Sequence, residues 1–361
     1  MNVYILAYAA FLTLIAAFLT LNALVPRKKE VYKPTSYMPK TLVMMPCKGF
    51  DIGLKENLMA AKMQSYGNYD LIAIVESKKD TAFKSIKQTH TKFIVADLDC
   101  NECSGKVINI ASALARFRNY EAYVILDSDV LVGRDWLRLL VAPLADKRVG
   151  ISTAFPFFEP VGRGFWQKVK HAWGFVGQGM MENSRTRFGW GGSLAFKKDL
   201  LSKMDFDYFS ESVSDDIALT NIARRKGLGI AYVPEANPVV RSDEDFGRFI
   251  EWSNRQTTLS VAGSRKILYF GLIFYSLSIL LLVSAALLGA LVNTLFFLLL
   301  APFAVGAVVL YLRSGGRSYM LGIYFIMNFI YLYNMIVASR TRTIEWRGRS
   351  YDITKIKNMQ Y

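Results

Sequence analysis

The chain contains 361 residues, 52% of them hydrophobic, and carries a formal net charge of +15. A composition that is both apolar and basic argues against an ordinary soluble enzyme and favours a membrane protein. The basic residues are spread along the chain and concentrate beside apolar runs, so we expect them to face an anionic lipid bilayer and not nucleic acid.

The N-terminal segment, residues 1–26, is predicted to be a transmembrane helix. Residues 3–25 carry no charge, and about 20 such residues span the roughly 30 Å hydrocarbon layer. A cleaved signal peptide is the alternative, but its positive charge would precede the apolar run, whereas Arg27, Lys28 and Lys29 follow it. The positive-inside rule then places the next domain, residues 36–262, in the cytoplasm.

The middle domain is predicted to be of the α/β class. Its short apolar runs alternate with helical stretches, which gives strands at 41–45, 71–75, 93–96 and 123–126 and helices near 53–65, 80–88 and 105–117. This alternation predicts βαβ units and a mostly parallel sheet covered on both faces. Ligands of such sheets bind at the carboxyl edge of the strands, where Pro46, Lys48, Glu76 and Asp127 fall.

Cys100 and Cys103 form a C-x-x-C pair. Three cysteines in all are too few for a disulfide framework. Because no second ligand pair is present in the sequence, we expect a surface turn here, with a zinc site as the alternative.

Asp127 and Asp129 follow a buried strand at i, i+2 spacing. From a turn at the end of a strand, two carboxylates can converge on one cation. Mg²⁺ or Mn²⁺ suits such a site, because both ions prefer oxygen ligands and leave positions open for phosphate oxygens. A solvated surface turn is the alternative, which the apolar residues on both sides of the pair disfavour.

A glycine-rich segment, residues 189–193, precedes the apolar run 194–196. Gly191 and Gly192 are either turn residues or positions where the backbone approaches a sugar or a phosphate closely. The sequence leaves both interpretations open, and we count Gly192 among the donor-binding candidates.

Asp215 and Asp216 begin a segment with apolar residues at helical spacing. Ser214 or Asp215 can simply cap that helix. In the functional interpretation, Asp216 is the catalytic residue, a general base that takes the proton from an acceptor hydroxyl.

Residues 245–260 are predicted to form an interfacial helix within the domain. Arg248 and Trp252 have two compatible interpretations. In the first, they are a snorkelling arginine and an aromatic anchor at the membrane interface. In the second, Arg248 offsets diphosphate charge and Trp252 faces acceptor or sugar.

Two apolar regions follow the domain. Residues 267–312 are charge-free and long enough for two spans, so residues 265–312 are predicted to form a transmembrane helical hairpin. Residues 318–339 are rich in Tyr and Phe and flanked by arginines, so we expect this third helix to lie in the interface or re-enter instead of crossing. The basic tail, residues 340–361, then lies in the cytoplasm.

Taken in order, these motifs resemble the ceramide glucosyltransferase (glucosylceramide synthase) family of inverting membrane glycosyltransferases. The resemblance covers about residues 41–351. The matching segments are 46–58 (P-x-K-G-x-D-x-x-L-x-x-N-L), Lys106 with Asn109, 127–129, 214–216, 248–252 (R-x-x-R-W) and 343–351 (W-R-x-G-R-Y). Two positions depart from the family pattern. Ser77 stands at the first aspartate, so Glu76 or Asp80 must substitute, and Glu251 replaces an arginine.

The resemblance implies a GT-A fold, a UDP-sugar donor, a divalent metal and inverting displacement at the anomeric carbon. The site residues that it implies are Pro46, Lys48 and Glu76 beside the uridine, Lys106 at the diphosphate, Asp127 and Asp129 at nucleotide and metal, Asp216 as base, and Arg248 with Trp252 over donor and acceptor. A metal ion and cationic side chains stabilise the negative charge that develops on the leaving diphosphate.

The expected reaction is therefore glycolipid synthesis, as in sphingolipid metabolism, with a membrane lipid hydroxyl as acceptor. A polyprenyl-phosphate glycosyltransferase is the main alternative. A polysaccharide synthase is disfavoured by the few spans after the domain, and a non-catalytic membrane scaffold by the intact Asp127, Asp129 and Asp216. The sequence leaves open the sugar, the acceptor and the oligomeric state.

Overall fold

The structure is a computed structural model that describes residues 3–24, 32, 36–100, 102–354 and 356. The chain divides into two compact units. The sheet unit contains residues 28–161, 176–242 and 342–361, and the helical unit contains residues 1–27, 162–175 and 243–341. Each unit is described by itself.

A seven-stranded sheet with the order β3-β2-β1-β4-β8-β6-β9 forms the centre of the sheet unit. Its strands are β1 (Thr41–Pro46), β2 (Tyr69–Val75), β3 (Phe93–Val95), β4 (Ala122–Leu126), β6 (Val149–Thr153), β8 (Ser193–Lys197) and β9 (Gly229–Tyr232). β8 runs antiparallel to β4 and β6, and the other pairs are parallel. The predicted mixed, mostly parallel sheet and its first four strands are confirmed.

Helices cover the sheet on both faces, which is why β1 and β4 are buried along their whole length. The helices of the sheet unit are α2 (Leu54–Lys62), α3 (Ala82–Gln88), α4 (Gly105–Arg116), α5 (Trp136–Val141), α7 (Lys203–Ser210) and α8 (Asp215–Arg225), with 3₁₀ turns at Ala142–Ala145, Lys198–Leu200 and Pro234–Ala236. α4 and α8 share one hydrophobic core with the central strands, to which they contribute Val107, Ile110, Leu219 and Ile222. This packing fixes the first turns of both helices at the edge where the strands end.

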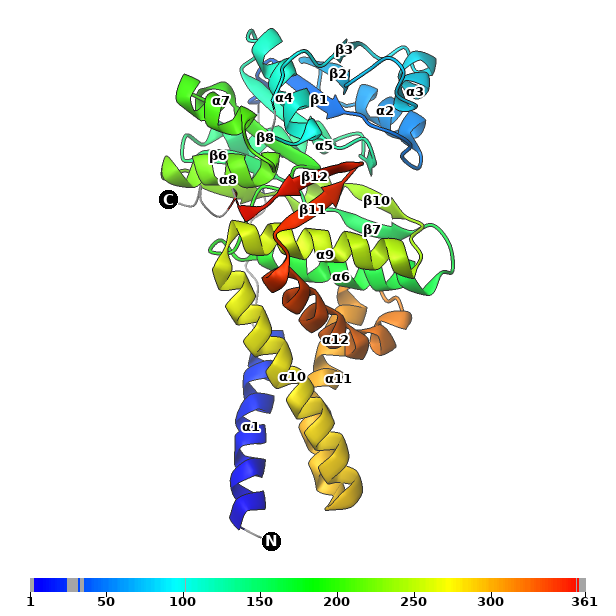
Figure 1. Cartoon of the computed structure of the whole chain (residues 1–361), viewed down its shortest axis with the longest axis vertical. Helices are drawn as coiled ribbons and strands as arrows, with labels where there is room; N and C mark the ends of the chain where they lie inside the picture. Colours follow the sequence, from blue (N-terminus) through cyan, green and yellow to red (C-terminus); the bar gives the residue numbers. More distant parts are fainter. Residues whose placement is uncertain (1–2, 25–31, 33–35, 101, 355, 357–361) are drawn as a thin grey trace. The chain divides into compact units, whose positions relative to one another are not determined.

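Two smaller sheets complete this unit. β5 (Val130–Leu131), β10 (Val239–Ser242) and β7 (Phe157–Pro160) form a three-stranded sheet, and β11 (Thr343–Trp346) pairs with β12 (Arg349–Asp352) as an antiparallel hairpin. Figure 1 shows this hairpin in red. The sequence predicts residues 340–361 only as a basic tail, whereas the structure folds part of them into the sheet unit.

The helical unit contains α1 (Val3–Leu24), α9 (Phe246–Gly263), α10 (Arg265–Leu291), α11 (Ala301–Arg313) and α12 (Tyr319–Arg340), with a 3₁₀ segment at Thr294–Leu300. α6 (Phe165–Glu182) contributes its first part, where Trp166 stacks on Phe249 of α9 with ring centroids 5.6 Å apart. The predicted interfacial segment, 245–260, therefore folds as part of α9, which groups with the membrane helices.

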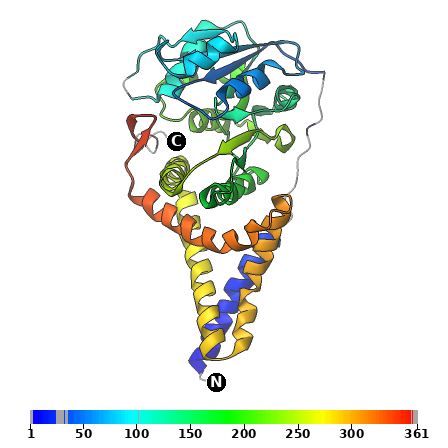
Figure 2. The same cartoon turned by 90° about the vertical axis from the view of Figure 1, so that its right-hand side faces the viewer.

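Four helices of the described chain are long and apolar enough to cross a membrane: Val3–Leu24, Arg265–Leu291, Thr294–Arg313 and Tyr319–Arg340. Figure 2 shows α12 lying across one end of the bundle that α1, α10 and α11 form. Length and composition thus allow α12 to cross, while its direction differs from that of its neighbours.

Candidate active site

Lys106 is the centre of a charged cluster. Its Nζ atom lies 2.7 Å from Asp127 Oδ1 and 3.2 Å from Asp215 Oδ2, and it donates a 3.2 Å hydrogen bond to the Gly191 carbonyl oxygen. The side chains of Lys106 and Asp215 are only 12% and 3% exposed, whereas Asp127 is 30% exposed. Lys106 and Asp215 are therefore buried, whereas Asp127 is accessible to solvent.

Local folding explains why these residues meet. Asp127 follows the buried strand β4, and its N–H donates to the Gly192 carbonyl oxygen at 3.2 Å. β4 and β8 run antiparallel with Leu126 opposite Ser193, so the glycine segment before β8 must lie beside the turn after β4. Ser104 caps α4 by accepting from the Val107 N–H, so the helix begins at Gly105 and Lys106 lies in its first turn.

Gly191 is the position where a side chain has no room. A Cβ atom there would lie 2.4 Å from Asp215 Oδ2 and 2.9 Å from Lys106 Nζ. At Gly192, the same atom would instead meet the ring of Trp190 at 2.2 Å. The backbone therefore approaches the charged side chains closely at Gly191, whereas the predicted Gly192 packs against Trp190.

Asp216 borders the same cluster. Its Oδ2 accepts from the Gly191 N–H at 3.4 Å, and its Oδ1 accepts from the Ile217 N–H at 2.8 Å and from the Ser214 hydroxyl. Ser214 binds the Asp216 carboxylate and makes no side-chain hydrogen bond that caps α8. The Asp216 side chain is half-buried, so one carboxylate of the pair is held by fixed donors and still reaches the surface.

Charge is unevenly balanced in this cluster. Burial, reinforced by the neighbouring carboxylates, raises the pKa of Asp127 and of Asp215 against the effect of Lys106. Burial opposes the charged form of Lys106, but Asp127 and Asp215 outweigh it and raise the pKa of its ammonium. Carboxylates therefore outnumber cations here, and a further cation would relieve their repulsion.

A divalent ion fits this surplus of carboxylate. Within the described ranges, no group of three or more His, Cys, Asp and Glu side chains has the geometry to hold a metal. Asp127 and Asp129 are the two carboxylates that could hold such an ion from the turn after β4, with other positions left for water or phosphate oxygens, as is usual for Mg²⁺. Asp129 lies near enough to Asp127 for its charge to raise the pKa of that residue.

Ser128, between the two aspartates, fixes this turn from inside the fold. Its hydroxyl donates a 2.5 Å hydrogen bond to Asp51 Oδ2, and its carbonyl oxygen accepts from Asn57 Nδ2 at 2.9 Å. Asp51 and Asn57 are both buried. The segment after β1 thus holds the aspartate turn in place. These hydrogen bonds explain why the polar side chains of Asp51 and Asn57 are buried.

The ends of β1 and β2 carry a second polar group. Pro46 is the last residue of β1, and Lys48 Nζ lies 3.1 Å from Glu76 Oε1. Asp80 Oδ1 instead accepts from the N–H groups of Gly49 and Ala82, at 2.8 and 2.9 Å. Glu76 therefore faces cationic side chains at the strand ends, while Asp80 has a local backbone role.

Arg248 and Trp252 belong to the helical unit. The Arg248 guanidinium is 55% exposed and pairs with Asp243 and Asp245, each at 3.3 Å. Trp252 packs edge-on against Trp173, with centroids 4.8 Å apart, and Lys170 Nζ lies 4.4 Å from its ring centroid. A donor-site role for these two residues rests on the resemblance alone.

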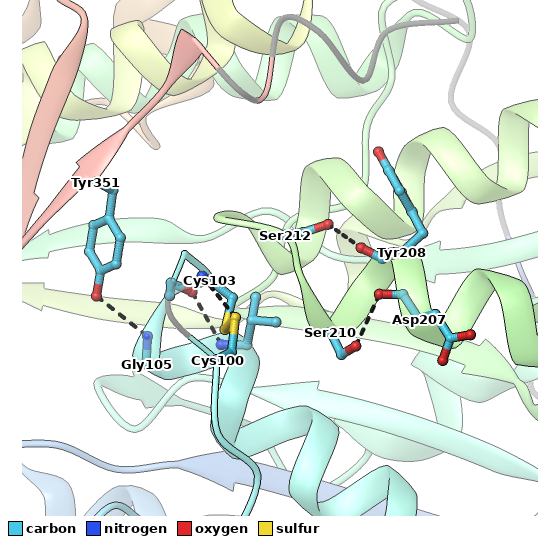
Figure 3. The surroundings of a disulfide bond; sticks show 10 residues. Cys100, Cys103, Gly105, Asp207, Tyr208, Ser210, Ser212 and Tyr351 are labelled. Carbon is cyan, nitrogen blue, oxygen red and sulfur yellow. Dashed lines mark hydrogen bonds between the residues drawn. A yellow bond between two sulfur atoms is a disulfide. The ribbon is translucent and has the colours of Figure 1, made fainter.

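Cys100 and Cys103, predicted to lie in a surface turn with a zinc site as the alternative, form a disulfide directly before α4. Figure 3 shows this bridge beside Gly105, whose N–H donates to the Tyr351 hydroxyl at 3.4 Å. The pair closes the loop that leads into the helix carrying Lys106.

Sequence reasoning missed two groups of residues that contact the charged side chains described above: Asp215, which pairs with Lys106, and two arginines that bind Asp51 and Glu76. Asp215 was assigned only to helix capping, although it is buried against Lys106. Arg347 and Arg349 were assigned to a tail, although their segment carries a hairpin signal, since alternating residues flank a turn that ends in Gly348.

A mannosyltransferase from Pyrobaculum calidifontis, solved with GDP-Man and Mn²⁺, matches 92% of this chain and 97% of its own at 19% identity and a TM-score of 0.54. Glucosyl-3-phosphoglycerate synthase from Mycobacterium tuberculosis matches 64% of this chain and 85% of its own at 15% identity and a TM-score of 0.43. A complex of that enzyme with Mn²⁺ and UDP-glucose matches 66% and 86% at 14% identity, also with a TM-score of 0.43. No curated protein matches the chain significantly.

The family model described as Glycosyl transferase family 21 matches residues 5–359. That match extends over both compact units and includes the residues of the charged cluster. The chain therefore belongs to glycosyl transferase family 21, the family of ceramide glucosyltransferase, and is a glycosyltransferase with a GT-A fold.

Proposed function

We propose that this enzyme transfers the sugar of a UDP-sugar, with inversion, to the hydroxyl group of a membrane lipid at the cytoplasmic face. The observation that carries the proposal is the meeting of Asp127, Lys106 and Asp216 around the Gly191 backbone. These residues come from three distant segments, and they supply a cation, a metal-ligating carboxylate and a base at one edge of the sheet.

Asp127 and Lys106 have the role of activating the donor. Asp127 and Asp129 would hold Mg²⁺ or Mn²⁺, which neutralises the diphosphate when bound. Lys106 adds a fixed positive charge, because its ammonium is held between Asp127 and Asp215. A charge that is already oriented stabilises the leaving diphosphate without reorganising during the reaction.

Asp216 has the role of activating the acceptor hydroxyl. Its carboxylate is oriented by the Gly191 and Ile217 N–H groups and remains half-exposed, so an acceptor hydroxyl can reach it. As the hydroxyl oxygen attacks the anomeric carbon from the face opposite the diphosphate, Asp216 takes its proton. A single displacement of this kind inverts the anomeric configuration.

A lipid acceptor is supported by the composition of the helical unit. Four of its segments are long and apolar enough to cross a membrane, and Arg27 to Lys29 follow the first of them. A cytoplasmic sheet unit and an interfacial α12 agree with the positive-inside rule. The direction of α12 across the end of the bundle supports the same arrangement (Figure 2).

Membranes that contain the full chain test this proposal when they are supplied with Mn²⁺ and radiolabelled UDP-sugars. We expect label in the organic-extractable fraction for one donor, abolished by EDTA, and mass spectrometry of that lipid identifies sugar and acceptor together. The exposed Asp207→Asn variant is the matched control for Asp216→Asn. Folded protein that labels no lipid with any donor would contradict the proposal.

A further inference from the structure

The β11–β12 hairpin has an arginine at an unusual position in its turn. Ile344 pairs with Tyr351 and Trp346 with Arg349, which leaves a two-residue loop of Arg347 and Gly348. Both loop residues have positive φ, 52° and 77°. Glycine adopts this conformation readily, whereas a residue with a Cβ atom rarely does, so an arginine at the first loop position calls for an explanation in its side chain.

The Arg347 side chain reaches the aspartate turn. Nη1 donates to the Lys48 carbonyl oxygen at 2.6 Å, and Nη2 donates to Asp51 Oδ1 at 2.7 Å. The other oxygen of Asp51 accepts from Ser128, which lies between Asp127 and Asp129. One buried carboxylate therefore links the hairpin arginine to the turn that would hold the metal.

The second strand of the hairpin holds the neighbouring strand ends. Arg349 Nη2 donates to Glu76 Oε2 at 2.8 Å, and Glu76 also pairs with Lys48. The Tyr351 hydroxyl accepts from the Gly105 N–H at 3.4 Å, at the first residue of α4. The hairpin thus contacts the ends of β1 and β2 and the start of the helix that carries Lys106.

Charge distinguishes Arg347 from an ordinary structural arginine. Burial opposes its charged form, but Asp51, Asp129 and Asp127 outweigh burial and raise the pKa of the guanidinium. The side chain is still 39% exposed, while its partner Asp51 is 6% exposed. The guanidinium is thus fixed by Lys48 and Asp51 while part of it stays accessible to solvent. A guanidinium fixed in this way can bind a phosphate group.

From this arrangement, we propose that the C-terminal hairpin is part of the donor site and that Arg347 binds the diphosphate of the nucleotide sugar. Arg349 is a positioning residue that orients Glu76. This inference rests on the proposed function and adds a donor-binding residue that lies beyond the last membrane helix in the sequence.

Binding measurements on the full chain in detergent, with Mn²⁺ present, test the role of Arg347. UDP and uridine are used to displace a labelled UDP-sugar from wild type, Arg347→Ala and Arg347→Gln. We expect either substitution to weaken UDP binding about tenfold or more, as for a lost charge-assisted hydrogen bond, and to change uridine binding much less. Arg342→Ala, an exposed arginine just before the hairpin, is the matched control and should bind both as wild type does.

Thermal unfolding separates this role from a structural one. Arg347→Gln keeps a donor for the Lys48 carbonyl oxygen. If Arg347→Ala does not fold, the binding measurements on Arg347→Gln decide whether Arg347 binds the diphosphate or only stabilises the fold. Equal weakening of UDP and uridine, or unchanged UDP binding in a folded variant, would overturn the assignment of Arg347. Wild type that binds no nucleoside diphosphate sugar would overturn the proposed function as well.

Discussion

The Lys106 ammonium lies 2.7 Å from the Asp127 carboxylate, at the point where α4 begins beside the end of β4. The same ammonium contacts Asp215, which is almost fully buried. One cation thus bridges two carboxylates from segments far apart in the chain, and the geometry of the site depends on it.

Removing that cation should destabilise the fold. Lys106→Met leaves the buried Asp215 without its partner, so we expect the free energy of unfolding to fall by about 3 kcal/mol. Thermal unfolding in detergent measures the loss. Lys92→Met is the matched control, because its pair with Asp70 is largely exposed and contributes little.

Adding Asp215→Asn to Lys106→Met should recover part of the lost stability, since it removes the uncompensated charge. Transfer should be abolished in both variants, because both lack the cation proposed to bind the diphosphate. A single Lys106→Met variant as stable as wild type would show that the ion pair with Asp215 is not maintained in solution.

Gly191→Ala should impair catalysis with little effect on the rest of the fold. The new Cβ atom would lie 2.4 Å from Asp215 Oδ2, so Asp215 and Lys106 must shift. A displacement of this size at a reacting centre lowers kcat by about tenfold to a hundredfold. Gly133→Ala is the control, because nothing lies within 4 Å of a Cβ atom there. Equal rates for both variants would show that the glycine is not needed.

Ser128→Ala should weaken metal binding without changing a metal ligand. It removes the 2.5 Å hydrogen bond to Asp51 that fixes the aspartate turn. Loss of such a supporting contact lowers metal affinity by about tenfold or more, which the Mn²⁺ dependence of transfer measures. Ser65→Ala, which removes an exposed hydrogen bond to Asp135, should leave that dependence unchanged. An unchanged dependence in Ser128→Ala as well would separate the turn from the metal.

The direction of α12 leads to a prediction of topology. If α12 lies in the interface, only α10 and the Thr294–Arg313 segment cross after the sheet unit, and the C-terminus stays in the cytoplasm. A glycosylation tag on a spacer at the C-terminus should then remain unmodified in eukaryotic microsomes, while the same tag at the N-terminus is modified. A modified C-terminal tag would show that α12 crosses.

The sheet and the aspartate turn were predictable from sequence because both depend on local patterns. The runs 41–45 and 123–126 are apolar throughout, as expected for strands that helices cover on both faces. The i, i+2 spacing of Asp127 and Asp129 after such a run places them at the ligand-binding edge. The contact between Lys106 and Asp127 could not be read from spacing, because it depends on how α4 packs.

Asp215 and the hairpin arginines were missed for a different reason. Helix capping explains an aspartate at the first helical position equally well, and only the burial of Asp215 decides between the two interpretations. Arg347 lies 296 residues from Asp51, so no local pattern connects them. Basic residues after an apolar helix are usually interpreted as a sign of membrane topology. That interpretation left the β11–β12 hairpin unpredicted.

Asp216→Asn tests the central claim most directly, when transfer and donor binding are measured on the same preparation. The carboxylate is proposed to take the proton of a lipid hydroxyl, so the amide should abolish transfer while UDP-sugar affinity stays within a few fold of wild type. Near-normal turnover by Asp216→Asn would contradict a hydroxyl acceptor and favour an anionic one, such as a polyprenyl phosphate, which needs no base.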